Sequence, residues 1–315
     1  MILETVERTQ QRTGQAVEEV LRQLSLPSAT YYRWRGRQRE GDLADQVAGS
    51  RPRVPLPTPG EAAAARDFAL SHPKMGYKRL AWQMVDEDVA YLRPYQVYRI
   101  LRERDLLRRM NRSEAGPLRR PPAPDHPDQV WHVDLMYVWI APRWYYLVDL
   151  LDGYSRFLVH WSLNTTMLAD TVTLTVQEAL ERLPDRQAGE PKLVHDHGSQ
   201  FLSAEWRAFV QGAGVTDIKT RVAHPQSNGR LERLHRTHRE EGLTEEALEA
   251  YHQALAAMTS WSDYYNYRRP HTALKYLCPA DYYRGDPQAR LAEREEKLVQ
   301  AVQARKAYWM GVCGC

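Results

Sequence analysis

The spacing of apolar residues changes along the chain, and each change marks a boundary between regions. In the first region four apolar residues recur at helical spacing: Val17, Val20, Leu21 and Leu24. This spacing predicts a helix over residues 3–24, which Pro27 separates from the next element. Ser28 is a favourable N-cap for a second, short helix over residues 29–37. The chain is therefore expected to begin with a small helical unit.

Two proline-rich stretches enclose a second helical region. Residues 49–60 contain four prolines and predict a stiff, extended linker. Residues 108–127, rich in proline and arginine, predict a second, basic linker that is either laid along a partner or a disordered tether. Between them, helical spacing predicts three helices, over residues 61–71, 78–85 and 94–104.

From residue 128 the pattern changes to that of strands. Runs of aromatic and branched residues predict strands over residues 130–138, 143–151 and 156–162. Asp152-Gly153 is expected to form the hairpin turn between the second and third. Helix and strand then alternate over residues 169–183, 192–195, 204–212 and 217–221, before a long helix that begins near residue 227. This order predicts an α/β domain with a mixed sheet flanked by helices.

Helical spacing returns in the last part of the chain. Residues 243–267 predict a helix whose apolar stripe is more typical of a core than of an oligomer seam. A charged helix follows Asp286 and is either a lone appendage or a partner surface. The boundaries together predict six segments: residues 1–48, 49–60, 61–107, 108–127, 128–285 and 286–315.

Composition narrows the class of protein. A chain of 315 residues is long enough for about two domains of roughly 100–200 residues each. Apolar residues make up 43% of the chain and its mean hydropathy is −0.63, which favours a soluble protein. No run of about 18 apolar residues or signal peptide is present, so we expect no membrane span and a cytoplasmic location. The chain has three cysteines, Cys278, Cys313 and Cys315. Because their number is odd, no disulfide framework is predicted. The pair in the tail could bind a metal, but a frayed end is the simpler interpretation.

The formal charge of +3 conceals an asymmetry. Residues 1–124 hold 22 Lys and Arg against 15 Asp and Glu, so the remainder holds 21 against 25. A basic first part indicates a polyanionic partner, although a solvated basic surface would have the same composition. The acidic second part suits a metal-dependent site.

Three acidic residues stand out by position. Asp134 lies inside an apolar strand, Asp196 ends a strand before Gly198, and Glu232 lies on the next long helix, with 35 residues between it and Asp196. A buried carboxylate without a partner costs several kcal/mol, and a bound cation removes that cost. Carboxylate oxygens are the ligands that Mg²⁺ prefers, and two such ions can catalyse phosphodiester chemistry. Separately, Asp196 could cap a turn, and Glu232 could pair with Arg236 on the surface.

Five motifs in a fixed order surround these residues: Trp131–Asp134, Leu150–Arg156, His195–Phe201, Pro225–Arg233 and Asn266–Leu274. With the 35-residue gap they make the chain resemble the DDE transposases of insertion sequences. The resemblance is to the class whose second reading frame, OrfB, encodes an integrase-type catalytic core (the IS-three group), and it covers about residues 28–283.

The resemblance implies a ribonuclease-H-like core, a mixed five-stranded sheet flanked by helices, with a retroviral-integrase-like site. It assigns catalysis and metal binding to Asp134, Asp196 and Glu232, and implies two Mg²⁺ ions for which Mn²⁺ can substitute. Asp149 and Asp152 remain structural in this pattern. His195 and His197 flank Asp196 without being expected ligands. His132 could shape the site, but core packing is the expected role.

DNA binding is the second implication. Helix-turn-helix modules preceding the core would read terminal inverted repeats of double-stranded DNA. The candidate contacts are Arg33, Arg35, Lys78, Arg79, Arg99 and Arg102 in the modules, and Asn228, Arg236 and Arg239 near the catalytic helix. The first module could instead be a helical hairpin with its own aromatic core, and Asn228 could only cap its helix. A homo-oligomer on element ends and target DNA, near the nucleoid, is implied, with a partner from an upstream frame as an option.

The implied activity is metal-dependent cleavage at element ends and strand transfer by the freed 3′-hydroxyl, without an organic cofactor. Two alternatives stay open from the residues. One is an inactive DNA-binding regulator derived from a transposase, against which the intact acidic triad argues. The other is a ribonuclease-H-like nuclease without strand transfer, against which the two upstream modules argue.

Overall fold

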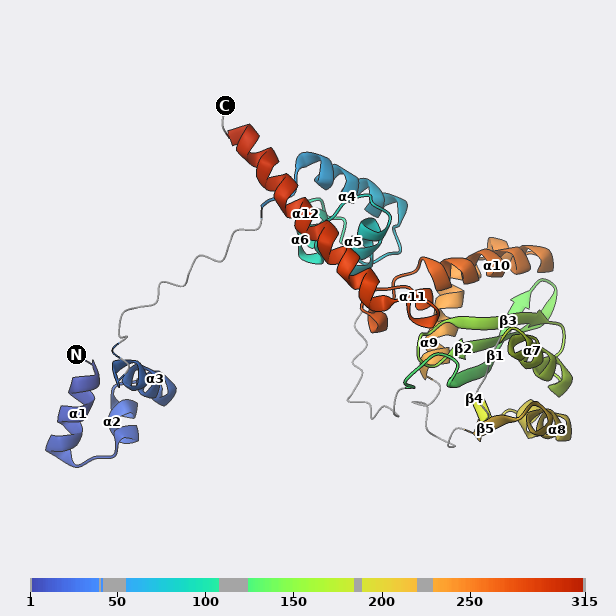
Figure 1. The fold of residues 1–315 in the computed structure, drawn as a ribbon, viewed down its shortest axis with the longest axis horizontal. Helices are drawn as coiled ribbons and strands as arrows, with labels where there is room; N and C mark the ends of the chain where they lie inside the picture. The colour runs from blue at the N-terminus through green and yellow to red at the C-terminus, as the bar shows by residue number, and fades with distance from the viewer. Residues whose placement is uncertain are drawn as a thin grey trace. The chain divides into compact units, whose positions relative to one another are not determined.

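The computed structural model describes residues 2–39, 41, 55–107, 124–183, 189–219 and 229–313, and Figure 1 draws their fold. The chain divides into two compact units, Met1–Val54 and Pro55–Cys315. The described helices include none that is both long enough and apolar enough to cross a membrane.

The first unit consists of α1 (Ile2–Thr13), α2 (Val17–Gln23) and α3 (Ser28–Arg39). Its small core joins residues from all three helices: Leu3, Val6, Val20, Leu21 and Tyr31. The single helix predicted over residues 3–24 is wrong, because Gly14 adopts φ +67° and separates α1 from α2. The predicted second helix is confirmed within α3.

The second unit begins with a three-helix module of α4 (Pro59–Ser71), α5 (Tyr77–Asp86) and α6 (Pro94–Glu103). Thr58 and Glu61 form a capping box at the start of α4, which fixes where that helix begins. The apolar sides of the helices meet in one core that contains Leu80, Met84, Leu92 and Val97. The three helices predicted here are confirmed.

A five-stranded sheet lies at the centre of the α/β domain. Its strands are β1 (Val130–Ile140), β2 (Arg143–Asp152), β3 (Leu158–Asn164), β4 (Gly189–His195) and β5 (Val215–Lys219). The spatial order is β3-β2-β1-β4-β5, with β1, β2 and β3 antiparallel and β4 and β5 parallel to β1. The hairpin turn predicted at Asp152-Gly153 is present but longer than expected, because β3 starts only at Leu158. Asp152 accepts hydrogen bonds from the amide and hydroxyl of Ser155.

Helices cover both faces of this sheet (Figure 1). One face packs on α7 (Ala169–Glu181) and α8 (Ala204–Ala213), which follows the short 3₁₀ turn η1 (Ser199–Leu202). The other face packs on α9 (Gly229–Thr237) and α10 (Tyr251–Tyr267). A mixed sheet of this order, enclosed by helices, confirms the predicted ribonuclease-H-like fold.

The segment between α9 and α10 differs from the prediction. A π-helical turn, η3 (His238–Gly242), and a 3₁₀ turn, η4 (Glu246–Leu248), come before α10. The helix predicted from residue 243 therefore starts later, at Tyr251. Residues 220–228, where the long helix was predicted to begin, lie outside the described residues.

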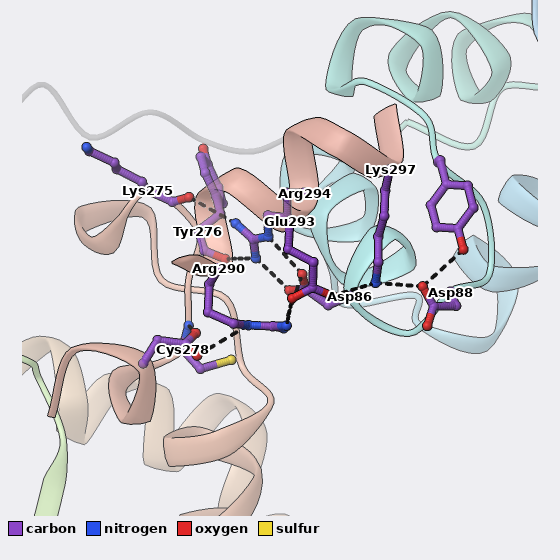
Figure 2. A network of polar contacts seen from close by, with 11 residues as sticks. Asp86, Asp88, Lys275, Tyr276, Cys278, Arg290, Glu293, Arg294 and Lys297 are labelled. Carbon is purple, nitrogen blue, oxygen red and sulfur yellow. Dashed lines mark hydrogen bonds and ion pairs between the residues drawn. The ribbon is translucent and has the colours of Figure 1, made fainter. Parts of the chain in front are cut away.

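The chain ends with η5 (Thr272–Leu274), α11 (Pro279–Tyr283) and α12 (Pro287–Cys313). The predicted charged helix after Asp286 is confirmed. Arg294 of α12 donates two hydrogen bonds to Asp86 of α5, at 2.7 and 2.5 Å, and others to the carbonyls of Lys275 and Tyr276 (Figure 2). Nε of Arg305 donates to both carboxylate oxygens of Glu61 of α4. The helix thus joins the three-helix module to the C-terminal end of the core.

Candidate active site

Asp134 lies in the middle of β1, with its side chain 15% exposed. The amide of Leu135 donates to its Oδ1 at 2.9 Å, and Nδ1 of His235 lies 3.8 Å from its Oδ2. Burial raises the pKa of Asp134 to about 6; His235 opposes this shift, while the negative charges of Asp196 and Asp149 add to it. The carboxylate therefore lies where additional positive charge would stabilise it.

Asp196 follows the last residue of β4. The parallel register of β1 and β4 pairs His132 with Val194, so Asp134 and Asp196 each lie two residues beyond that pair. The sheet therefore brings the two aspartates to neighbouring positions, as their electrostatic interaction also indicates. The amide of Gly198 donates to Oδ1 of Asp196 at 2.9 Å, which orients the carboxylate.

His195 is fully buried beside Asp196. Its Nδ1 lies 2.7 Å from the carbonyl oxygen of Asp196, and its Nε2 lies 2.6 Å from Oδ1 of Asp217. The indole Nε1 of Trp206 donates to the same Asp217 oxygen, and Phe201 stacks on the imidazole. Both ring nitrogens thus have oxygen partners within the protein. His195 holds the backbone of Asp196, whereas His197 is exposed.

Glu232 lies in the first turn of α9 and is exposed. Its neighbours Leu231 and Leu234 are buried in the core, which fixes the helix that carries it. Among the residues that the structure describes, no three His, Cys, Asp or Glu side chains are already grouped as a metal site. The sheet therefore brings Asp134 and Asp196 together, and Glu232 lies on the helix whose His235 contacts Asp134.

A cluster that the sequence did not reveal lies beneath this helix. Asp149 of β2 is fully buried, and its Oδ2 lies 3.3 Å from Nε2 of His235 and 3.1 Å from Nε2 of His238. Burial alone would raise the pKa of Asp149, but the two histidines outweigh it and hold that pKa well below its usual range. Likewise, burial would lower the pKa of His235, yet Asp149 and Asp134 raise it. The only sequence signal was an acid in an apolar strand and two histidines three residues apart.

His132 belongs to the core rather than to a ligand set. It is 6% exposed, and its Nε2 lies 3.0 Å from a guanidinium nitrogen of Arg230. Burial, together with Arg230 and Arg156, lowers the pKa of His132 to about 3. Its ring is therefore a neutral acceptor for Arg230, which also donates to the carbonyl of Gly153.

The proposed DNA contacts differ in accessibility. Six of these residues are exposed, two on or just after α9 and four in the helical modules: Arg236, Arg239, Arg33, Lys78, Arg99 and Arg102. Arg35 is half-buried in α3. Arg79 contacts Glu241 of the core at 3.3 Å and so has an intramolecular partner. Asn228 lies outside the described residues. DNA contact by each of these residues stays a prediction.

Comparison with protein families agrees with this geometry. Residues 124–225 and residues 213–279 each match a family model described as an integrase core domain. A protein of insertion element IS407 from Burkholderia multivorans is 28% identical over 229 residues, which cover 70% of this chain and 80% of that protein. The transposase InsD of element IS2 from Escherichia coli is 25% identical over 67% of this chain and 74% of its own length. The transposase of IS904 from Lactococcus lactis is 26% identical over 50% of this chain and 61% of its own length.

Among solved structures, the catalytic core domain of HTLV-2 integrase in complex with magnesium aligns with 50% of this chain and 98% of its own, at 15% identity and a TM-score of 0.42. The fold and the matched models define a protein with an integrase-type core. The chain contains an integrase core domain and is similar to proteins and transposases of insertion sequences.

Proposed function

We propose that this protein is a metal-dependent DNA transposase that cuts element ends and joins them to a target. The observation that carries the proposal is the register of β1 and β4, which sets Asp134 and Asp196 at neighbouring positions of one sheet. The half-buried location of both carboxylates and the raised pKa of Asp134 fit a site completed by cations. Integrase cores as a family use divalent metals.

Asp134 and Asp196 would hold the metal, with Glu232 as the third carboxylate. Oxygen donors of this kind suit Mg²⁺, or Mn²⁺ in its place. When bound, a pair of such ions activates the attacking oxygen and stabilises the leaving oxygen. The protein's own part is to keep the carboxylates oriented, through Gly198 at Asp196 and through Leu135 at Asp134.

The proposed reaction has two displacements at phosphorus. In the first, a water oxygen attacks the phosphodiester at an element end, and the strand breaks to leave a free 3′-hydroxyl. In the second, that hydroxyl oxygen attacks a target phosphodiester and displaces a target 3′-oxygen, which takes up the proton. One site serves both, because they differ only in the nucleophile.

The partner in this proposal is double-stranded DNA, as terminal inverted repeats and as target. Arg236 and Arg239, exposed on and just after the helix that carries Glu232, would meet the backbone near the cut. Lys78, Arg99 and Arg102 would contact DNA from the three-helix module, and Arg33 and Arg35 from the first unit. Two ends must be joined in one event, so the active form would be a homo-oligomer, working in the cytoplasm.

The test is a cleavage and strand-transfer assay on duplexes that carry the inverted repeats flanking the gene. With Mg²⁺ we expect a nick at the repeat end and joined products from pre-cleaved ends. Asp134→Asn, Asp196→Asn and Glu232→Gln should each lower both rates by more than about 100-fold. Mutating residues that only orient metal ligands already costs up to about 100-fold in activity. The matched control is Asp170→Asn, which removes an exposed carboxylate at the start of α7.

Each other outcome has a definite meaning. Cleavage that persists in all three variants would show that these carboxylates do not form the site. Cleavage without joining would favour a nuclease, and specific binding of the repeats without cleavage in Mg²⁺ or Mn²⁺ would favour a regulator.

A further inference from the structure

Asp149 has no part in the proposed chemistry, although it lies next to the site. In the antiparallel pair of β1 and β2 it is directly opposite Asp134, so both side chains point to the same face of the sheet. Asp149 is fully buried, and Leu147 and Leu151 on either side of it along that face belong to the apolar core. An acid at such a position is costly unless it is paired, so its partners indicate what it does.

Those partners are both histidines of the chain segment that carries Glu232. His235 and His238 approach the same Oδ2 of Asp149, at 3.3 and 3.1 Å. His235 lies one helical turn after Glu232, and His238 lies one turn further on. The segment is therefore attached to β2 at two successive turns, directly after its catalytic carboxylate.

The first attachment also reaches β1. The imidazole of His235 has Nε2 toward Asp149 and Nδ1 at 3.8 Å from Oδ2 of Asp134. One ring thus lies between the two facing carboxylates. Any rotation of α9 about its axis would move Glu232 and break both contacts.

The second attachment coincides with a change in helix geometry. The α-helix ends at Thr237, and the π-helical turn η3 begins at His238. Trp261 of α10 packs against the ring of His238, with 4.2 Å between ring centroids. A π-helical turn is rare and is frequently found at functional sites. Here it sets the buried His238 between Asp149 and Trp261.

We propose that Asp149 is a positioning residue: through His235 and His238 it fixes the rotation and height of the helix that presents Glu232 beside Asp134. This inference rests on the proposed function for its catalytic consequence. Its structural part, that Asp149 anchors residues 229–242, is independent of that function and is measured separately.

The test uses the full chain with the substitution Asp149→Asn. Two readouts do not depend on turnover: hydrogen exchange of residues 229–242 without DNA, and Mn²⁺ binding, followed by electron paramagnetic resonance, to the complex with a pre-cleaved element end. We expect exchange in residues 229–242 to become at least about 10-fold faster and Mn²⁺ affinity to fall about 10- to 100-fold, as for other groups that orient metal ligands. The turnover number should fall with the affinity, while KM for DNA stays unchanged.

His160→Gln is the matched control. It breaks a different contact between a histidine and a carboxylate, that of His160 with Glu178 at 2.8 Å, between β3 and α7. It should leave both readouts unchanged. If Asp149→Asn does not fold, His235→Gln keeps the contact between Asp149 and His238, and should still weaken Mn²⁺ binding.

Two results would overturn the proposal. One is wild-type exchange of residues 229–242 in Asp149→Asn. The other is faster exchange throughout the sheet with unchanged Mn²⁺ affinity, which is the result of a purely structural role. If the wild type itself neither binds Mn²⁺ nor joins DNA, the proposed function fails, and hydrogen exchange still decides whether Asp149 anchors the helix.

Discussion

Several charged side chains are buried in this protein and paired with a group distant in the sequence. Asp149 meets His238, Arg294 meets Asp86, and Arg269 meets Glu241 at 2.6 and 2.8 Å. Burying such a pair contributes little net stability, but removing one partner leaves an unpaired charge at a cost of about 3–5 kcal/mol. These pairs therefore determine which elements can pack together.

The ion pair of Glu241 with Arg269 can be tested through its effect on stability. Burial would raise the pKa of Glu241, but Arg269 and Arg79 outweigh that effect and lower the pKa below its ordinary value of 4.5. The contribution of Glu241 to stability is thus present above that value and is lost as the pH falls through the lowered pKa. We expect Glu241→Gln to reduce the free energy of unfolding by about 3 kcal/mol at pH 7 and to flatten its fall below about pH 5. Urea unfolding from pH 7 to pH 3 measures both.

The control for that experiment is Glu240→Gln, which changes the adjacent, exposed glutamate. It should shift stability by less than about 0.5 kcal/mol at every pH. Equal effects of the two substitutions would show that the contact with Arg269 does not stabilise the fold.

The sequence singled out a residue when that residue was unusual among its immediate neighbours in the chain. Asp134 is a carboxylate among apolar strand residues, so its unusual position was visible. The partners of Asp149 could not be predicted, because His235 and His238 lie 86 and 89 positions further along the chain. Only the folded sheet brings them together. For the same reason, the partner of His195 was hidden, since Asp217 lies on a different strand.

Among the elements of the α/β domain, the π-helical turn η3 interrupts the α-helical geometry that α9 begins. Gly242 ends it, and a Cβ atom there would lie 2.9 Å from Cγ of Trp261 and 3.1 Å from Cδ1. The close approach of this backbone to the indole is what lets Trp261 pack on His238. The glycine is therefore required by packing.

The substitution Gly242→Ala should destabilise the protein by about 1–3 kcal/mol, because Trp261 or the turn must move to admit the methyl group. Gly212→Ala in α8 is a matched control, since a Cβ there meets no atom within 4 Å. It should be neutral or stabilising by up to about 1 kcal/mol. Thermal unfolding of both variants decides the point, and equal melting temperatures would contradict the packing argument.

Most elements could be predicted from apolar spacing, and the errors share a cause. Spacing alone does not show where a helix is interrupted. Gly14 divides the first predicted helix by adopting a left-handed conformation, and η4 replaces the first turns of the helix predicted from residue 243. Both interruptions are set by backbone geometry and tertiary packing rather than by a loss of apolar period.

At the scale of the second unit, α12 connects the three-helix module with the core (Figure 2). Arg294, only 3% exposed, bonds to Asp86 of the module and to the carbonyl of Tyr276 in the core, and its guanidinium lies over the ring of Trp82. Arg290 adds contacts to Asp86 and Asp281. One helix therefore connects the three-helix module to the C-terminal end of the core.

Arg294→Ala should lower the free energy of unfolding by about 3 kcal/mol, because Asp86 and the carbonyl of Tyr276 both lose a partner. Lys306→Ala removes one positive charge from an exposed position of the same helix and should have an effect below about 0.5 kcal/mol. Urea unfolding combined with hydrogen exchange of α5 distinguishes the variants. Unchanged exchange of α5 in Arg294→Ala would show that α12 does not hold the module.

In the proposed mechanism, Asp134, Asp196 and Glu232 gather around a pair of metal ions when DNA is bound. The most direct measurement is a Mn²⁺ titration of the complex with a pre-cleaved element end, followed by electron paramagnetic resonance. We expect two spin-coupled ions per active site, about 3.5–4 Å apart, and loss of the coupled pair in each variant Asp134→Asn, Asp196→Asn and Glu232→Gln. Retention of the coupled pair in all three variants, or absence of bound Mn²⁺ in the wild-type complex, would contradict this mechanism.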